Sequence, residues 1–113
     1  MKIVYAGAAA LALFSIAIFG SGTPAQSAAA PIIVHVKDFK YDPTPLKLHV
    51  GDTVTFINDD EEPHTVTATD KSFDSAALDT NGSWKYTFKK AGTFAYFCEL
   101  HPYMKATIVV EGK

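Results

Sequence analysis

The 113-residue chain contains no arginine and a single cysteine. Without arginine it has no guanidinium groups, which are the usual bidentate binders of phosphate and carboxylate. Its ten lysines are outnumbered by twelve acidic residues, which gives a formal charge of −2. This balance argues against a nucleic-acid ligand, because nucleic-acid-binding proteins need a basic surface. With one cysteine, no disulfide bond can form within the chain.

The N-terminal part has the layout of a secretory leader. Lys2 precedes an apolar run from Ile3 to Phe19, and small residues follow up to Ala30. A positive start, an apolar centre and a small-residue cleavage region are typical of a signal peptide. We therefore expect residues 1–30 to be a signal peptide, cleaved between about residues 27 and 31, and residues 31–113 to form a periplasmic or secreted domain without a stable membrane span. The alternative is an uncleaved anchor, since the run approaches the roughly 20 residues that cross a bilayer.

The remaining chain alternates apolar and polar residues in five segments and shows almost no helical pattern. The segments are 32–36, 46–57 with an interruption at Gly51-Asp52, 83–88, 94–98 and 106–110. Alternation with period two is typical of strands that bury one face. Short strands separated by Gly, Pro and Asp turns indicate an all-β sandwich or barrel. Residues 70–82 have no firm periodicity, and we expect them to form an ordered loop.

The lone cysteine belongs to a group of three possible ligands. Cys98, His101 and Met104 follow one another at intervals of three residues, between two predicted strands. In a tight reversal of the chain this spacing can direct a thiolate, an imidazole and a thioether toward one centre. An unpaired thiol outside the cytoplasm is vulnerable to oxidation, and a bound metal ion is the obvious protection.

The other three histidines differ in their surroundings. His35 and His49 each lie between inward-pointing residues of a predicted strand, so we expect both to face solvent. His64 follows Pro63 and opens a strand-like segment after an acidic run. It is therefore the candidate for the second imidazole at the same end of the sandwich.

The combined ligand types select the metal. Two imidazoles and a thiolate with a weak axial thioether are the ligand set of a blue copper electron-transfer centre. Zinc usually takes four nitrogen, sulfur or oxygen donors without a thioether. The alternative is that Cys98 and Met104 simply fill the core, since both residue types are commonly buried. The spacing and the second histidine favour one copper ion held by His64, Cys98, His101 and Met104.

At these residues the chain resembles the cupredoxins, the small blue copper proteins, and within them the amicyanin group. The resemblance rests on the segments VGDTVTFIN, PHTVT, FDS, YTFKKAGTFAYFC and HPYM. Plastocyanin and pseudoazurin have two more residues between the last histidine and the methionine, so the short C-x2-H-x2-M loop is the amicyanin-like feature. The resemblance implies a Greek-key β-sandwich with one type 1 copper ion at one end. It also implies transfer of single electrons between redox partners, and no enzymatic activity.

The resemblance also implies roles for two residues next to the ligands. Asn58 matches the family's asparagine that ties the two ligand-bearing loops together. Glu99 stands where amicyanin has threonine directly after the cysteine. The resemblance therefore does not imply a hydrogen bond between this position and Asn58. A carboxylate near the thiolate is expected to influence the reduction potential, because groups around the ligands tune the metal.

The surface around His101 is the expected docking site for redox partners. Pro63, Pro102 and Tyr103 would form an apolar patch there, and such patches mark contact sites. The acidic run 59–62 would attract a basic partner over a long range. Candidates are a c-type cytochrome or a quinoprotein dehydrogenase, and we expect the protein to be a monomer.

Two other functional classes remain as alternatives. A periplasmic copper-binding or copper-handling protein could use the same ligands, but such proteins tend to be rich in methionine, and residues 31–113 contain only Met104. A copper oxidase or reductase would need a second metal site or a further domain. Residues 31–113 leave no room for either.

Overall fold

The computed structural model describes residues 30–112, and residues 1–29 of the expected signal peptide lie outside this range. The described residues form eight strands and no helix. The strands are β1 (Ile32–Lys37), β2 (Lys40–Asp42), β3 (Leu46–His49), β4 (Thr53–Asn58), β5 (Thr67–Ala68), β6 (Ser83–Thr87), β7 (Gly92–Cys98) and β8 (His101–Glu111). Within this part of the chain, no helix is long and apolar enough to cross a membrane.

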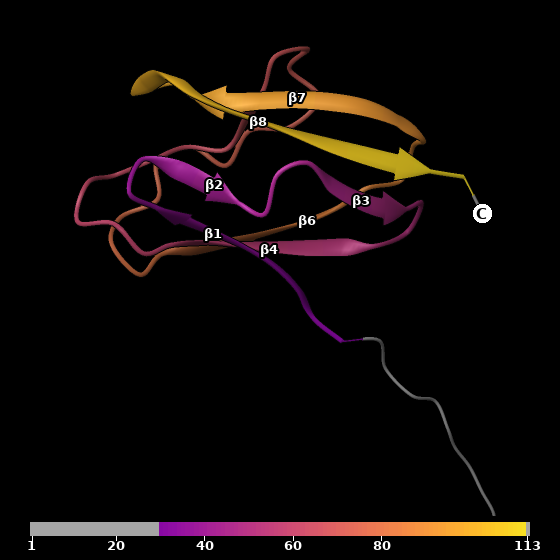
Figure 1. Cartoon of the computed structure of the whole chain (residues 1–113), viewed down its shortest axis with the longest axis horizontal. Coiled ribbons are helices and arrows are strands. Elements are labelled where there is room, and N and C mark those ends of the chain that lie inside the picture. Colours follow the sequence, from indigo (N-terminus) through magenta and orange to yellow (C-terminus); the bar gives the residue numbers. More distant parts are fainter. Residues whose placement is uncertain (1–29, 113) are drawn as a thin grey trace, which may run out of the picture. The chain divides into compact units, whose positions relative to one another are not determined.

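The strands form two sheets that pack face to face as a sandwich (Figure 1). One sheet has the order β2-β1-β4-β6 and the other β3-β8-β7-β5. Neighbouring strands are antiparallel except for the pairs β1/β4 and β3/β8, which are parallel. Both parallel pairs arise because the chain crosses between the sheets before it returns to a neighbouring strand. The predicted all-β sandwich is confirmed.

The core lies between the inner faces of the two sheets, as the alternation predicts. Its central residues are at most 3% exposed; they are Val34, Val36, Val54 and Phe56 from one sheet and Leu48, Tyr96, Ile108 and Val110 from the other. The side chains of His35 and His49 are 52% and 64% exposed, so the expectation that both face solvent is confirmed. At Gly51 the turn between β3 and β4 has φ 99°, a conformation that glycine adopts without steric cost.

The structure differs from the sequence-based expectation in two strands. The short strand β2 was not expected, because three residues are too few to show a period. Strand β8 begins at His101 instead of near Ala106, since Cys98 and His101 are already paired across the reversal. The reversal therefore occupies only Glu99 and Leu100, after an irregularity in the β7 register between Phe97 and Cys98. Residues 70–82 form a loop that contains only isolated bridges, as expected.

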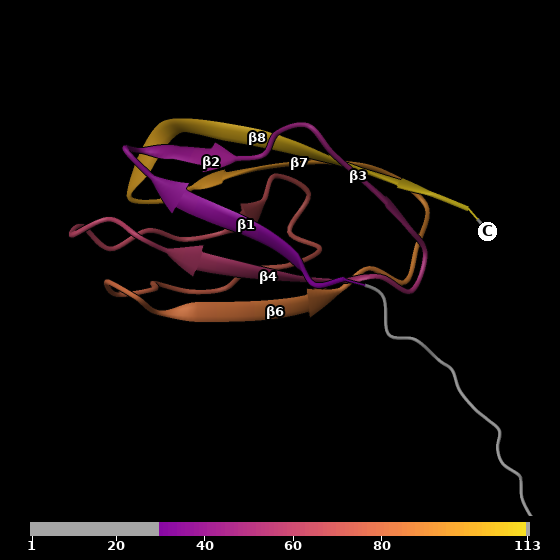
Figure 2. The ribbon, with the colours of Figure 1, turned by 60° about the horizontal axis from the view of Figure 1, so that its bottom comes forward.

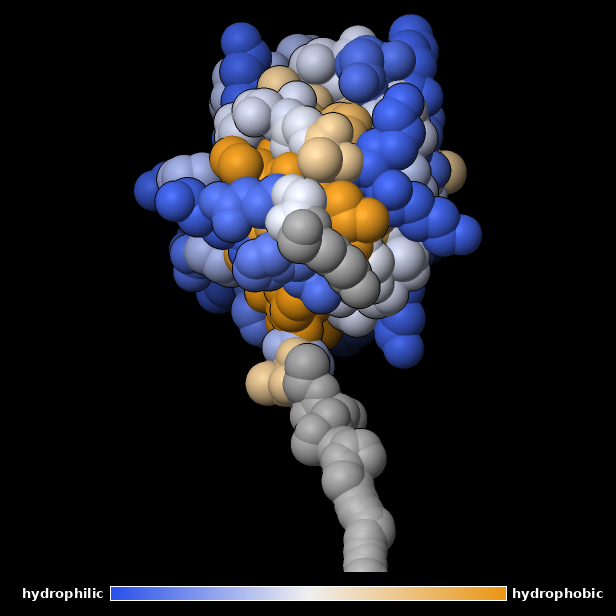
Figure 3. Space-filling view, turned by 90° about the vertical axis from the view of Figure 1, so that its right-hand side faces the viewer, coloured by the Kyte–Doolittle hydropathy of each residue, from blue (hydrophilic) through white to orange (hydrophobic). Residues whose placement is uncertain are grey.

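Three strand ends lie at the same end of the sandwich. Strands β1, β4 and β7 all run toward the left-hand end of Figure 2. They are followed by the turn Asp38-Phe39, by the loop 59–64 and by the reversal at Glu99-Leu100. Figure 3 looks onto the opposite end, where hydrophilic residues surround a strip of apolar surface. The sheet topology therefore brings three segments that are far apart in the sequence to one end of the molecule.

Candidate metal centre

Three predicted ligands converge at this end. His64 comes from the loop after β4, Cys98 ends β7 and His101 begins β8, and their possible ligand atoms all lie within 4.8 Å of one another. Cys98 Sγ is 3.7 Å from His64 Nδ1 and 3.6 Å from His101 Nδ1. His64 and Cys98 are fully buried, whereas His101 is partly exposed.

These distances fit a shared metal ion. Metal–sulfur bonds of about 2.3 Å and metal–nitrogen bonds of about 2.0–2.1 Å are typical of such sites. In a trigonal arrangement they place sulfur and nitrogen about 3.7 Å apart. The two sulfur–nitrogen distances agree with this value, so one thiolate and two imidazoles already have the spacing of ligands to one ion.

Asp60 orients His64. The ring Nε2 lies 2.7 Å from Asp60 Oδ2, and the Asp60 side chain is only 11% exposed. A proton held on Nε2 leaves the lone pair of Nδ1 free to bind a metal. Burial alone would raise the pKa of Asp60, but hydrogen bonds from the backbone N–H groups of Phe39 and Asp38 and from His64 outweigh it and lower that pKa. The sequence analysis included Asp60 only as part of the acidic run 59–62 and did not connect it with His64, which lies four residues later.

Thr65 connects the two ligand-bearing segments. Its backbone N–H points at Cys98 Sγ at 3.3 Å, and its hydroxyl accepts a hydrogen bond of 2.8 Å from the backbone N–H of Glu99. The Tyr41 hydroxyl donates to the Thr65 carbonyl. Burial, followed by the nearby Cys98 sulfur, raises the pKa of Tyr41 far above its usual range. Thr65 was missed by the sequence analysis; its only signal was its position directly after His64.

Asn58 and Glu99 are not paired in the described residues. The Asn58 side chain is fully buried and donates to the carbonyls of Glu62 and Leu78, while its oxygen accepts the Asp60 N–H. It therefore braces the loop after β4 against the loop before β6. The Glu99 side chain is exposed, and its backbone N–H is bonded to Thr65. The bond between the ligand-bearing segments thus comes from Thr65, since Asn58 ends β4 and turns toward its own loop.

Comparison with known proteins places the chain in a family. The model of a cupredoxin-like domain matches residues 8–110. The chain belongs to the cupredoxin-like family. Amicyanin from Paracoccus denitrificans is 37% identical over 92 residues, which are 77% of this chain and 70% of that protein. Amicyanin-alpha from Methylorubrum extorquens is 31% identical over 113 residues, covering 92% of this chain and 95% of that protein.

Solved structures agree with this assignment. A Cu(I) form of an amicyanin variant matches with a TM-score of 0.68 and 33% identity, over 76% of this chain and 87% of that chain. An oxidised form of another amicyanin variant gives the same TM-score, identity and coverage. The donor set in the structure and the family together assign one type 1 copper ion to this cupredoxin as its cofactor.

Met104, the fourth predicted ligand, is a buried residue of β8 in this cupredoxin. It is 2% exposed and belongs to the same core cluster as Cys98. The burial of a thioether three residues beyond His101 is compatible with a weak axial ligand and also with core packing. Its assignment as a ligand therefore stays a prediction.

The three residues predicted for the docking patch are all exposed. Pro63 and Pro102 lie on the surface, and Tyr103 is 69% exposed. Leu100, which the sequence analysis did not include, is 50% exposed. Of these side chains, Tyr103 packs against the His101 ring, with centroids 6.1 Å apart. The docking patch itself stays a prediction.

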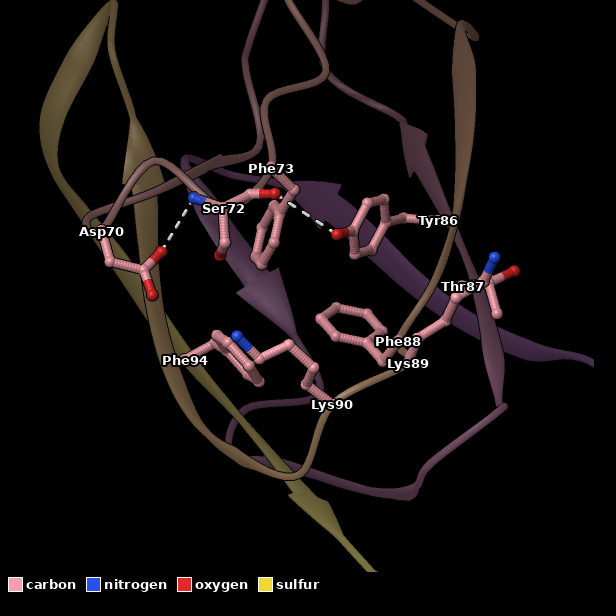
Figure 4. A pocket seen from close by; sticks show the side chains of 9 residues that line it. All are labelled: Asp70, Ser72, Phe73, Tyr86, Thr87, Phe88, Lys89, Lys90 and Phe94. Carbon is pink, nitrogen blue, oxygen red and sulfur yellow. Dashed lines mark hydrogen bonds between the residues drawn. The ribbon is translucent and has the colours of Figure 1, made fainter.

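Two pockets lie near charged residues. One, of about 390 Å³, is an acidic cleft beside His64, lined by Lys37, Asp38, Phe39, Asp59, Asp60, Glu61 and Glu62. The other, of about 400 Å³, contains none of the predicted site residues; its aromatic walls Phe73, Tyr86, Phe88 and Phe94 are shown in Figure 4. These rings pack against one another and continue the core.

Proposed function

We propose that this protein is a small exported blue copper protein that carries single electrons between redox partners. The observation that carries the proposal is the triangle of Cys98 Sγ and the two Nδ1 atoms, with sulfur–nitrogen distances of 3.7 and 3.6 Å. Bound copper would supply the Cu(I)/Cu(II) couple. Amicyanin structures with copper as Cu(I) and in the oxidised state support this function by family membership.

In this proposal His64, Cys98 and His101 are the strong ligands and Met104 is the weak axial one. The protein keeps these groups in place through bonds that do not involve the metal. Asp60 holds the proton on His64 Nε2, and the Thr65 N–H points at the Cys98 sulfur. A coordination sphere that is held in this way needs little rearrangement when an electron arrives or leaves, and donors at the sulfur tune the potential. Nothing in this function requires a bond-forming reaction, so we expect no enzymatic activity.

His101 is the proposed point of electron entry and exit. Its ring is the only one of the three converging side chains that is partly exposed. Pro63, Pro102 and Tyr103 would form the apolar contact surface around it, and desolvation of such a surface favours association with a partner. Asn58 would brace the loop that carries His64, and the Glu99 carboxylate would influence the reduction potential.

The partner we propose is a basic redox protein, with a c-type cytochrome or a quinoprotein dehydrogenase as candidates. The acidic residues 59–62 lie on the loop that leads to His64 and line the acidic cleft beside it. Opposite charges increase the rate of encounter between proteins. We also propose that residues 1–30 are a cleaved signal peptide, and that the mature domain 31–113 is a periplasmic or secreted monomer.

The deciding experiment is the visible spectrum of the Cu(II) protein. A thiolate in a trigonal site should give an intense blue colour, which reversible reduction removes and oxidation restores. Cys98→Ser should abolish the colour, while the control Thr67→Ser, another buried position, should keep it. A colourless Cu(II) complex, or copper that cannot be cycled between its two states, would contradict electron transfer and favour a copper-handling protein.

A further inference from the structure

The two ligand histidines are supported in different ways. Ligand histidines are usually oriented through their second ring nitrogen, which donates a hydrogen bond to a carboxylate, a carbonyl or water. His64 has such a bond to Asp60. Within residues 30–112, His101 makes a hydrogen-bond contact only through Nδ1, to the Cys98 sulfur. No protein group within these residues holds the second ring nitrogen of His101, so packing is the means by which the protein itself can orient this ring.

The ring of Phe39 supplies the closer part of that packing, while the Tyr103 ring lies against His101 with centroids 6.1 Å apart. It meets the His101 ring edge to face, with centroids 4.9 Å apart and an interplanar angle of 87°. It meets the His64 ring in the same manner at 5.2 Å and 82°. On its outer side it stacks with Tyr103 at 6.5 Å. The Phe39 ring thus contacts both ligand imidazoles and Tyr103, the aromatic residue of the predicted docking patch.

Phe39 occupies a backbone position that disfavours a large side chain. Asp38 and Phe39 form the two-residue turn between β1 and β2, with φ values of 54° and 60°. Turns with two such residues normally contain Asn-Gly or Asp-Gly. A bulky residue in the left-handed region is rare and costs conformational energy. Glycine would suit position 39 better for the backbone alone, so the ring must have a use at this place.

Asp60 fixes the turn that carries this ring. Its carboxylate accepts the backbone N–H of Asp38 at 2.7 Å and that of Phe39 at 3.0 Å. The same carboxylate accepts the Nε2 proton of His64. Asp60 therefore orients one ligand directly and the other through Phe39.

We propose that Phe39 is a positioning residue for electron transfer. Its ring holds the His101 imidazole with Nδ1 toward Cys98 whether or not a metal is bound. The proposal deepens the proposed function, because it names the residue that keeps the exposed electron-transfer ligand in one orientation. Its structural part can be tested without copper.

The test compares the ring order of His101 in four metal-free proteins. Wild type, Phe39→Gly, Phe39→Tyr and Asp38→Gly are labelled with ¹⁵N at histidine and examined by NMR at about pH 8, above the ordinary imidazole pKa of about 6.5. Phe39→Gly removes the ring and relieves the backbone. Asp38→Gly relieves the backbone at the neighbouring turn position and keeps the ring, so it is the matched control.

We expect a single ordered orientation of the His101 imidazole in wild type, in Asp38→Gly and in Phe39→Tyr, because all three keep an aromatic ring at position 39. In Phe39→Gly the His101 signals should broaden or split, with alternative orientations populated roughly two- to tenfold more, as expected for the loss of an aromatic pair. The His64 signals should stay sharp, since Asp60 still holds that ring. The free energy of unfolding should change little, because backbone relief offsets the lost packing.

A second readout uses the copper-loaded proteins. The electron self-exchange rate should fall by a similar factor in Phe39→Gly and return in Phe39→Tyr. An equally ordered His101 ring in metal-free Phe39→Gly and in Asp38→Gly would overturn the proposal. If the wild type proves not to be a blue redox protein, the proposed function fails, yet the metal-free spectra still decide whether Phe39 positions His101.

Discussion

The two histidines of the metal centre have the same chemistry and opposite surroundings. Each directs Nδ1 at Cys98 Sγ, at 3.7 Å for His64 and 3.6 Å for His101. His64 is fully buried and bonded to a carboxylate. His101 reaches the surface and is packed between aromatic rings. In the proposed function the outer edge of His101 meets the redox partner and cannot be covered by a buried hydrogen bond. Contacts with neighbouring aromatic rings orient this imidazole instead.

Removal of each ligand imidazole in turn should show the largest difference between the two histidines. Both His64→Gly and His101→Gly should lose the blue copper site. Free imidazole should restore the colour only in His101→Gly, since that position opens to solvent, whereas the space left by His64 is closed. The measurement is a titration of each Cu(II) variant with imidazole, followed by its visible spectrum. Equal restoration in both variants would show that burial does not distinguish the two ligands.

Replacement of Asp60 should weaken the support of His64 and of the turn that carries Phe39. In Asp60→Ala the His64 Nε2 proton and two backbone N–H groups lose their acceptor. The free energy of unfolding of the metal-free protein should fall by about 1–3 kcal/mol, and copper affinity by about 10- to 100-fold. Urea denaturation and a competitive copper titration measure these effects. Asp59→Ala, the neighbouring acidic residue, is the control and should change copper affinity little.

Thr65→Val should weaken the connection between the segment that carries His64 and the segment that carries Cys98, without removing a ligand. Valine keeps the shape and the backbone N–H toward Cys98, but the Glu99 N–H loses its acceptor. We expect the metal-free protein to lose about 1–2 kcal/mol of stability in urea denaturation, as for a lost buried acceptor. Thr107→Val on β8 is the control. A stability equal to that of the control would mean that Thr65 does not join the two segments.

Met104→Leu should have the smallest effect on folding and a selective effect on the metal. A swap of similar apolar volume in a packed core usually costs less than about 1.5 kcal/mol. If Met104 is the axial ligand, the reduction potential should shift while copper stays bound and blue. Cyclic voltammetry measures the shift, with Leu48→Met as a core control away from the ligands. An unchanged potential would leave Met104 as a residue of the core alone.

Much of the fold and the ligand group could be predicted from local patterns. The alternation around Val34, Phe56 and Ile108 indicated which face of each strand is buried, because successive side chains of a strand point to opposite sides. The spacing of Cys98 and His101 identified the ligand-bearing reversal. The start of β8 was misplaced, since strand pairing across a two-residue reversal depends on the register between strands and leaves no periodic signal of its own.

The amino-acid sequence by itself determined the class of the sandwich, its inward faces and three ligand types that select copper, because these depend on residue chemistry and short-range periodicity. Only the tertiary structure decided what holds the ligands. Phe39, Asp60 and Thr65 belong to segments that meet because β1, β4 and β7 end together. An aromatic residue in a turn, one acid in an acidic run and one threonine among several carry no local mark of that role. Their function arises from contacts across the fold, where one carboxylate and one ring orient both imidazoles.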